Sequence, residues 1–399
     1  MIEHSHPFGS GRRIRVAVYQ TRMATGGAQD VTLTLLRHFN RERFEPIIIL
    51  RQGDGEWMDR IPSDVEVRVL DARVRSGWIK LASVLRAINP DVVLSMSSTG
   101  NLTACLGHWV GRVRCPLVVS ERNSFSDAWR GSRLRLPIRI VKSLLYRRPR
   151  TIITVSRGVQ EDLQRTLGIP GERTETIYNP IVSPTLAARA EESVEHPWFK
   201  EDVPIVLAVG RVVEQKDFET LVRAFHRVRA DRDARLVVLG DGDQRGPLLR
   251  LVEQLGLSDS VSFPGFVPNP APYMRHCSVF VLSSRYEGLP GVLIQAMACG
   301  APVISTDCPS GPAEILTDGD SGLLVPTGDP DALSRAITDV LGDAQLRERL
   351  RRGGSSRAAD FSVEGSVARF EEVLESAVFG DRPFAPTKEF LATSMADQN

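Results

Sequence analysis

The feature that most constrains the fold is a repeated alternation of short apolar runs, polar or glycine-bearing turns, and segments with helical spacing of apolar residues. Residues 14–19 (IRVAVY) and 205–209 (IVLAV) each open one such series. Runs that are apolar nearly throughout are typical of parallel strands buried on both faces. Parallel strands need a crossover connection, usually a helix, so the alternation predicts doubly wound α/β architecture. Because the series restarts once, the sequence predicts two such domains.

Composition excludes several classes of protein. The chain of 399 residues has 50 basic and 49 acidic side chains, which argues against a nucleic-acid binder. Its five cysteines are scattered and odd in number, as expected of buried thiols in a reducing compartment rather than of a disulfide framework. No apolar run approaches the roughly 20 residues that span a bilayer. These features favour a cytoplasmic protein.

The domain boundaries follow from where the alternation starts and stops. The sequence predicts a first domain over residues 14–182 and a second over residues 201–362. Residues 183–200 are polar and aperiodic, as expected of a linker. A helix over 363–380 is expected to pack back on the first domain. The segments 1–13 and 381–399 are expected to be a disordered lead-in and a disordered tail.

The stretch 279–316 has the strongest pattern. An apolar run ends at a turn that contains Glu287 and Gly288, a helical segment follows at 292–298, and a second apolar run leads into a loop rich in glycine and proline. In a parallel sheet, such turns lie at the carboxyl edge, where ligands bind. An acidic residue beside a helix start is also a common partner of the helix dipole, so this pattern alone leaves two interpretations of Glu287.

Further candidates follow other strands. Gly26 and Gly27 lie between a first strand and its helix, where backbone amides can face an anion. Arg211 and Lys216 follow the first strand of the second domain. If the carboxyl edges of the domains face each other across a cleft, these cations, the Gly26 and Gly27 amides and the amides of the 287–292 turn form a site for a diphosphate. A surface salt bridge is the alternative for Arg211 and Lys216.

Two features of the first domain leave alternatives open. The polar residues after the strand at 117–120 are candidates for an acceptor site or members of an ordinary loop; they are Glu121, Arg122 and Asn123. The segment 132–150 predicts a basic amphipathic helix. Such a helix either docks on an anionic membrane or packs on the sheet with a solvated basic face. The cations expected to face the membrane are Arg139, Lys142, Arg147 and Arg148.

Five motifs together resemble one known family. The chain is similar to the retaining, nucleotide-sugar-dependent glycosyltransferases of family 4, and the resemblance covers about residues 14–378. Its specific part lies in the second half. The motifs are Gly26-Gly27-Ala28, Gly210-Arg211 with Lys216, Gly240-Asp241-Gly242, Glu287-Gly288-Leu289-Pro290, and the segment 298–303 (ACGAPV). The resemblance implies the GT-B fold, with two Rossmann-like domains facing across a cleft.

The resemblance also implies roles for single residues. Arg211 and Lys216 would hold the donor diphosphate, and Glu287 would bind hydroxyls of the donor sugar. The family's second acidic residue, which holds the ribose, falls at Gln295, so this chain departs from the pattern. A neutral hydrogen bond there is worth less than a charged one, about 0.5–1.5 against 1.5–3 kcal/mol. The donor-binding backbone is expected at Gly26, Gly27, Gly288, Leu289, Pro290, Gly291 and Val292.

The resulting expectation is a retaining transferase without metal or cofactor. Its donor would be a nucleotide sugar, with UDP favoured over GDP, and its acceptor a glycan or a polyprenyl or other lipid-linked sugar of cell-surface polysaccharide or glycolipid synthesis. Its location would be cytoplasmic, with peripheral attachment to the inner face of the plasma membrane as an option. A same-fold sugar-nucleotide epimerase and a non-catalytic nucleotide-sugar-binding protein are the alternatives.

Overall fold

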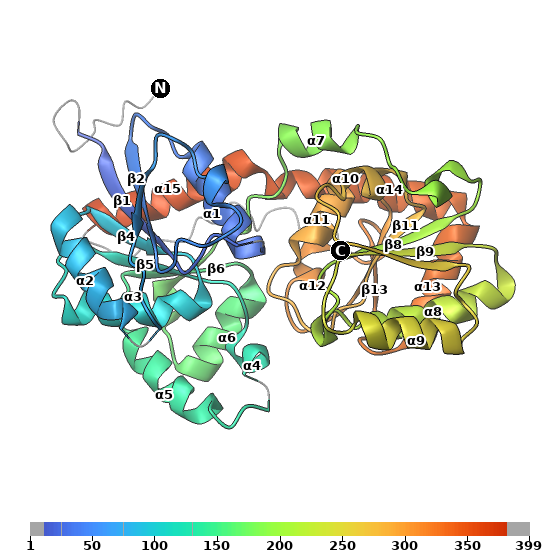
Figure 1. Ribbon diagram of the computed structural model, residues 1–399, viewed down its shortest axis with the longest axis horizontal. Helices are drawn as coiled ribbons and strands as arrows, with labels where there is room; N and C mark the ends of the chain where they lie inside the picture. Colours follow the sequence, from blue (N-terminus) through green and yellow to red (C-terminus); the bar gives the residue numbers. More distant parts are fainter. Residues whose placement is uncertain (1–11, 25, 75, 130, 381–399) are drawn as a thin grey trace, which may run out of the picture. The chain divides into compact units, whose positions relative to one another are not determined.

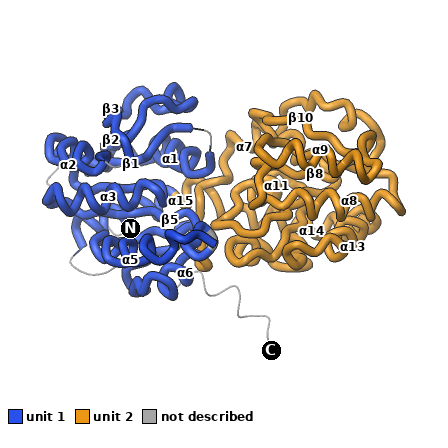
Figure 2. The backbone as a smooth tube through the Cα atoms, turned by 60° about the horizontal axis from the view of Figure 1, so that its bottom comes forward, with its two compact units in different colours: residues 1–155, 159–177, 367–399 blue, residues 156–158, 178–366 orange. Residues whose placement is uncertain are grey.

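The computed structural model describes residues 12–24, 26–74, 76–129 and 131–380, which form two compact units (Figure 2). Within this range, unit 1 holds the residues up to 155, 159–177 and those from 367 on. Unit 2 holds 156–158 and 178–366. The expected tail at 381–399 and all but residues 12 and 13 of the expected lead-in lie outside the described residues.

Unit 1 is built on a parallel sheet of seven strands in the order β3-β2-β1-β4-β5-β6-β7. Figure 1 labels β1, β2, β4, β5 and β6 of this sheet. Its strands are β1 (Ile14–Gln20), β2 (Phe44–Leu50), β3 (Glu66–Val69), β4 (Val92–Ser95), β5 (Leu117–Glu121), β6 (Thr151–Thr154) and β7 (Thr174–Thr176). Its helices are α1 (Gly27–His38), α2 (Gly77–Ile88), α3 (Ser98–Val110), α4 (Phe125–Ala128), α5 (Arg135–Leu145) and α6 (Arg157–Leu167), together with most of α15 (Val363–Phe379).

The core of unit 1 follows from the alternation of side chains along its strands. Ala17 and Tyr19 of β1 lie in register with Ile47 and Ile49 of β2, and all four belong to one buried cluster. Helices α2 and α3 contribute to the same cluster. At Gly107 of α3, a Cβ atom would lie 2.8 Å from a backbone carbonyl of α2, so the close contact of the two helices requires small residues. Such residues weaken the helical spacing of large apolar side chains on which a prediction from sequence depends.

Unit 2 has a parallel sheet of six strands in the order β10-β9-β8-β11-β12-β13. Its strands are β8 (Ile205–Val209), β9 (Arg235–Leu239), β10 (Val261–Gly265), β11 (Val279–Leu282), β12 (Val303–Thr306) and β13 (Leu323–Val325). Its helices are α7 (Pro184–Ala190), α8 (Phe218–Asp231), α9 (Arg245–Gln254), α10 (Ala271–His276), α11 (Gly291–Ala298), α12 (Pro312–Ile315), α13 (Pro330–Gly342) and α14 (Ala344–Ala358).

In each unit the strand order reverses beside the first strand. In unit 1, β1 pairs with β2 on one side and with β4 on the other; in unit 2, β8 pairs with β9 and β11. The connections on the two sides of such a strand leave in opposite directions, which opens a crevice at the carboxyl edge of the sheet. The predicted doubly wound α/β fold is confirmed, and the turn with Glu287 follows β11, at the crevice of unit 2.

Residues 183–200 differ from the linker that the sequence predicts. They form α7 and a 3-10 turn (Pro197–Lys200) within unit 2. The side-chain amide of Asn269 donates to the Arg189 carbonyl at 2.9 Å, and Ala190 is buried. Short helical turns of this kind lack the long apolar period on which the prediction depended.

Helix α5 corrects the expectation for the basic amphipathic segment. Lys142 was expected on a surface with other cations, but it is buried, and its Nζ lies 2.6 Å from Glu121 Oε2. In the predicted amphipathic helix, the spacing of Val141 and Leu144 sets them on one face with Ile138 and Leu145. Val141 and Leu144 are instead exposed, whereas the other two pack on the core. A buried lysine with a buried carboxylate partner sets the rotation of this helix.

None of the helices in the described part of the chain is long and apolar enough to cross a membrane.

Candidate functional site

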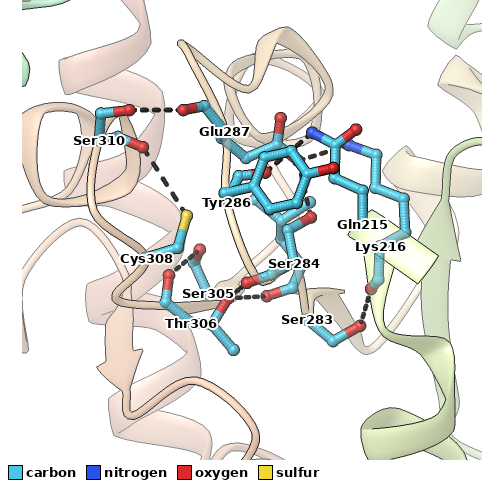
Figure 3. A network of polar contacts seen from close by, with 11 residues as sticks. Gln215, Lys216, Ser283, Ser284, Tyr286, Glu287, Ser305, Thr306, Cys308 and Ser310 are labelled. Atoms are coloured by element: carbon cyan, nitrogen blue, oxygen red, sulfur yellow. Dashed lines mark hydrogen bonds and ion pairs between the residues drawn. The ribbon is translucent and has the colours of Figure 1, made fainter. Parts of the chain in front are cut away.

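Two loops of unit 2, one after β8 and one after β11, are joined by hydrogen bonds at the carboxyl edge of the sheet (Figure 3). Ser283 Oγ donates to the Lys216 carbonyl at 2.8 Å. The Arg285 amide donates to the Gln215 carbonyl at 2.8 Å, and Gln215 Nε2 donates to the Tyr286 carbonyl at 2.8 Å. Because each contact involves backbone, the contacts hold the two loops in a defined relative position.

An ion pair strengthens this junction. Asp217 begins α8 in a left-handed conformation, with φ of 47°. Its carboxylate accepts hydrogen bonds from Thr220 Oγ1 at 2.9 Å and from Arg285, whose Nε lies 3.1 Å from Oδ2. Hydrogen bonding to Asp217 raises the pKa of the Arg285 guanidinium above its usual value. Arg285 therefore stays charged and ties the β11 loop to the start of α8.

This junction brings Lys216 and Glu287 together. Lys216 Nζ lies 2.5 Å from Glu287 Oε1, and Ser284 Oγ donates to the same oxygen at 2.6 Å. The lysine side chain is 14% exposed and the glutamate side chain 9%, so solvent screens the pair only weakly. Glu287 Oε2 has no hydrogen-bond partner among the described residues. The site thus presents one cation and one open carboxylate oxygen side by side.

The loop after β12 packs against the Glu287 turn. Ser310 Oγ donates to the Glu287 carbonyl (Figure 3). Gly311 has φ of 95°, and a Cβ atom there would lie 2.6 Å from Pro290 Cδ and 3.0 Å from the Gly288 carbonyl oxygen. Glycine at this position therefore permits the close approach of the two loops. The turn is supported from both sides.

The thiol nearest this turn is not a nucleophile. Burial raises the pKa of Cys308 to about 12, with a further contribution from the Glu287 carboxylate. A thiol with so high a pKa is protonated at neutral pH, and the thiolate is the reactive form. The polar side chain that this turn offers to a ligand is that of Glu287, with its open Oε2.

Helix α11 begins immediately after the turn, at Gly291. The first amides of a helix have no acceptor within the helix and carry partial positive charge, which suits an anion. Gln295 lies one helical turn after Gly291, on the same face of α11. Its side chain is half-buried and has no hydrogen-bond partner in the described part of the chain. Its amide is free to bind a ligand hydroxyl.

Arg211 lies at the start of the β8 loop and is exposed. The neighbouring β9 loop packs closely here. At Gly240, with φ of 136°, a Cβ atom would lie 1.9 Å from the Gly210 carbonyl oxygen, and the Val212 amide donates to the Asp241 carbonyl at 2.9 Å. The Gly240-Asp241-Gly242 motif is thus a packing feature of this edge.

In unit 1, Gly26 and Gly27 stand at the start of α1, after β1. A Cβ atom at Gly27 would meet no atom within 4 Å, so the backbone there is open to an approaching group. The two glycines belong to unit 1 and the Lys216–Glu287 pair to unit 2. The predicted joint site across a cleft stays a prediction.

The three polar candidates after β5 have different surroundings. Glu121 is 1% exposed and contacts Lys142 and the Tyr146 hydroxyl, so its carboxylate belongs to the interior of unit 1 and does not face an acceptor. Burial lowers the pKa of Arg122 to about 10, an effect that the Glu121 carboxylate partly offsets. Asn123 is exposed. Of the three residues, Glu121 is the one whose burial contradicts the role expected of it in an acceptor site.

Several residues of the unit 2 site were not predicted. Ser283, Ser284 and Arg285 directly follow β11, and Asp217 directly follows Lys216. Polar side chains at the end of a parallel strand were the available signal. Within residues 12–24, 26–74, 76–129 and 131–380, no group of three or more His, Cys, Asp or Glu side chains is placed to hold a metal ion.

Comparison with known proteins adds a family context to this geometry. Residues 190–357 match the family "Glycosyl transferases group 1", and residues 25–182 match "Glycosyltransferase Family 4". The two matches include the unit 2 site and the glycine loop of unit 1.

Three curated relatives illustrate the range of similarity. The N-acetylgalactosamine-N,N'-diacetylbacillosaminyl-diphospho-undecaprenol 4-alpha-N-acetylgalactosaminyltransferase of Campylobacter jejuni is 28% identical over 87% of this chain and 95% of its own. The 2-deoxystreptamine N-acetyl-D-glucosaminyltransferase of Streptomyces fradiae is 29% identical over 88% and 90%. The lipopolysaccharide core biosynthesis glycosyltransferase LpsE of Rhizobium meliloti is 38% identical, over 44% of this chain and 51% of its own.

Solved structures share the fold. The Anabaena protein HepE, in a crystal structure in complex with UDP-glucose, superposes with a TM-score of 0.77 at 20% identity, covering 91% of this chain and 100% of that one. The sucrose-phosphate synthase of Thermosynechococcus elongatus superposes with a TM-score of 0.74 at 20% identity, covering 91% and 99%.

Proposed function

Since the chain carries a family 4 domain followed by a group 1 domain, and so is a glycosyltransferase of the family 4 type with the GT-B fold, we propose that it moves a sugar from a nucleotide sugar to an acceptor with retention of configuration. The observation that carries the proposal is the Lys216–Glu287 pair at the carboxyl edge of unit 2. In this proposal the Lys216 ammonium binds the donor diphosphate and the neighbouring Glu287 carboxylate binds hydroxyls of the donor sugar.

The leaving group of such a reaction is a nucleoside diphosphate, whose negative charge grows as the sugar–phosphate bond breaks. The Lys216 ammonium, the exposed Arg211 and the first amides of α11 offer positive charge to it. Preorganised positive groups that meet developing charge supply a large part of many rate enhancements. We propose that these groups carry the charge without a divalent cation.

Glu287 would bind the donor sugar. Its open Oε2 can accept a hydrogen bond from a sugar hydroxyl while Oε1 stays with Lys216 and Ser284. Retention follows from the family resemblance: the acceptor hydroxyl attacks from the face that the phosphate leaves, and the departing phosphate oxygen takes the proton. Both bonds then change on one face of the sugar, so the site needs no separate carboxylate base.

The donor is proposed to be a UDP-sugar, with GDP-sugars as the alternative. HepE, which has the same fold, was crystallised with UDP-glucose. The acceptor is proposed to be a lipid-linked sugar or a glycan of cell-surface polysaccharide or glycolipid synthesis. The Campylobacter relative is named for an undecaprenol-linked substrate, and the Rhizobium relative for lipopolysaccharide core synthesis. These names support the proposed location of the reaction, in the cytoplasm at the inner face of the plasma membrane.

The test is incubation of the protein with a panel of UDP- and GDP-sugars, followed by nuclear magnetic resonance of the products. Slow release of nucleoside diphosphate and free sugar supports transfer, a glycoside that keeps the donor's anomeric configuration on an added acceptor alcohol supports retention, and release that persists in EDTA supports metal independence. Interconversion of two nucleotide sugars would instead identify an epimerase.

Gln295 favours a second candidate, a non-catalytic nucleotide-sugar-binding protein. Where the family pattern has a carboxylate, this chain has a neutral amide, which makes a weaker hydrogen bond to a ribose. Binding of a nucleotide sugar without turnover, with every acceptor tried, would support this function over transfer.

A further inference from the structure

Helix α5 of unit 1 presents several of its apolar residues outward, although Ile138 and Leu145 pack on the core. Ile140 is 52% exposed, Val141 48% and Leu144 60%. Leu134 and Leu136, at the start of the helix, are also exposed. A helix on the surface of a water-soluble domain normally turns its apolar stripe to the core and its charges to water. In α5 the only lysine points inward instead.

The inward lysine fixes this orientation. Lys142 Nζ lies 2.6 Å from Glu121 Oε2, and the ammonium is 4.9 Å from the centre of the Tyr146 ring and 5.6 Å from that of Phe125. Turning the helix to bury its apolar residues would remove Lys142 from Glu121 and leave a buried carboxylate without its cation. Such a loss is strongly destabilising. The outward apolar face is therefore a stable property of the folded domain.

Arginines surround this face. The segment 128–160 contains no acidic residue. Arg133, Arg135, Arg139 and Arg147 are exposed. At the end of the helix, the Arg148 guanidinium lies 4.4 Å from the ring centre of Trp109, a half-exposed side chain at the end of α3. The surface thus combines apolar side chains with a positive border, and we name it the α5 face.

We propose that the α5 face docks on an anionic lipid bilayer, and this rests on the proposed function, in which the acceptor is lipid-linked. Outward apolar residues on a helix with a basic border insert at the boundary between headgroups and acyl chains, and arginines bind the anionic headgroups. A second copy of this chain fits less well, because a two-fold contact would set the same arginines against each other. The positive border selects the bilayer as the occupant.

Co-sedimentation with vesicles tests the docking. Full-length protein is mixed with vesicles of phosphatidylcholine alone or of equal parts phosphatidylcholine and phosphatidylglycerol. The protein should bind the second kind much more strongly. The double variant Ile140→Ser, Leu144→Ser should bind at least about tenfold more weakly, because two apolar side chains no longer enter the lipid. The control Leu249→Ser changes a leucine of α9 that is 42% exposed, and it should leave binding unchanged.

Charge variants give an independent measurement. Arg139→Gln and Arg147→Gln should each lower the partition coefficient roughly fivefold, and added salt should weaken binding of the unchanged protein. Loss of an exposed side chain should not lower the melting temperature. Failure of the unchanged protein to bind phosphatidylglycerol vesicles would overturn the proposal, as would equal binding by the double variant. Self-association of the unchanged protein that this variant abolishes would also overturn it, in favour of a second copy as occupant.

The outcome is separable from that of the proposed function. Donor hydrolysis is measured in solution without vesicles, and the α5 variants should retain the rate of the unchanged protein, since α5 lies in unit 1 and the Lys216–Glu287 pair in unit 2. Hydrolysis without vesicle binding refutes only the docking. Vesicle binding without hydrolysis or transfer of any donor refutes only the transferase.

Discussion

Replacing Glu287 by glutamine separates binding of the leaving group from catalysis. Glutamine has nearly the same shape and keeps an oxygen that can accept from Ser284, but it has no charge. The Lys216 ammonium lies 2.5 Å from the Glu287 carboxylate. A donor diphosphate must therefore share this ammonium with Glu287. In Glu287→Gln the ammonium is released to the diphosphate.

Two effects of opposite direction are expected. The rate of donor turnover should fall about 10²- to 10³-fold, the effect of removing one interaction with the transition state. The affinity for the free nucleoside diphosphate should be kept or rise. A charged hydrogen bond is worth roughly 1.5–3 kcal/mol and a neutral one 0.5–1.5, so releasing Lys216 gains about 1 kcal/mol, or roughly fivefold in Kd. Little solvent screens the pair, since the two side chains are 14% and 9% exposed.

The assay combines calorimetric titration of UDP with initial rates of UDP-sugar hydrolysis. Glu214→Gln is the matched control: it removes an acidic group from the same loop, but this side chain is 82% exposed and pairs with Arg285 at 3.3 Å. It should leave both quantities nearly unchanged. A parallel loss of UDP affinity and rate in Glu287→Gln would refute the reasoning, because Glu287 would then act by holding Lys216 in place. A near-normal rate would remove Glu287 from the site.

Three further predictions concern the same structure. Gln295→Glu should keep activity and keep or tighten donor binding in the same titration, because a carboxylate makes a stronger bond to a ribose hydroxyl; abolished binding would show that Gln295 does not face the ribose. Gly240→Ala should destabilise unit 2 by at least about 1–3 kcal/mol in urea unfolding, because the new Cβ atom would lie 1.9 Å from the Gly210 carbonyl oxygen, and an unchanged midpoint would contradict the close packing of these loops. Lys142→Met should destabilise unit 1 by about 3–5 kcal/mol by leaving Glu121 buried without its cation, and Glu121→Gln in the same chain should restore much of this; additive losses in the double-mutant cycle would refute a coupled pair.

Much of the fold could be predicted from the sequence because its signals are local. The runs at 205–209 and 279–282 become β8 and β11 as expected, since a parallel strand buried on both faces must be apolar along its length. The functional turns could be found for a related reason. A polar loop after such a strand lies at the carboxyl edge of the sheet, and this locates Lys216 and Glu287 without any knowledge of contacts.

The contacts inside the site depend on residues distant in the chain. Lys216 and Glu287 are 71 positions apart and meet because β8 and β11 are neighbours in the sheet. The Arg285–Asp217 pair that holds their loops together has no local pattern. The sequence could suggest that such groups converge. Only the pairing of the strands decides which side chains touch.

The sequence by itself determined two α/β domains, their main strands, and an acidic turn opposite a basic loop in the second. Tertiary structure decided how α5 is rotated. The apolar and basic residues of this helix allow either face to point inward, so helical periodicity cannot choose between them. Glu121, buried at the end of β5, makes burial of Lys142 favourable and thereby turns Ile140 and Leu144 to the surface. The buried ion pair joins residues of two different elements, so no local pattern in the sequence records it.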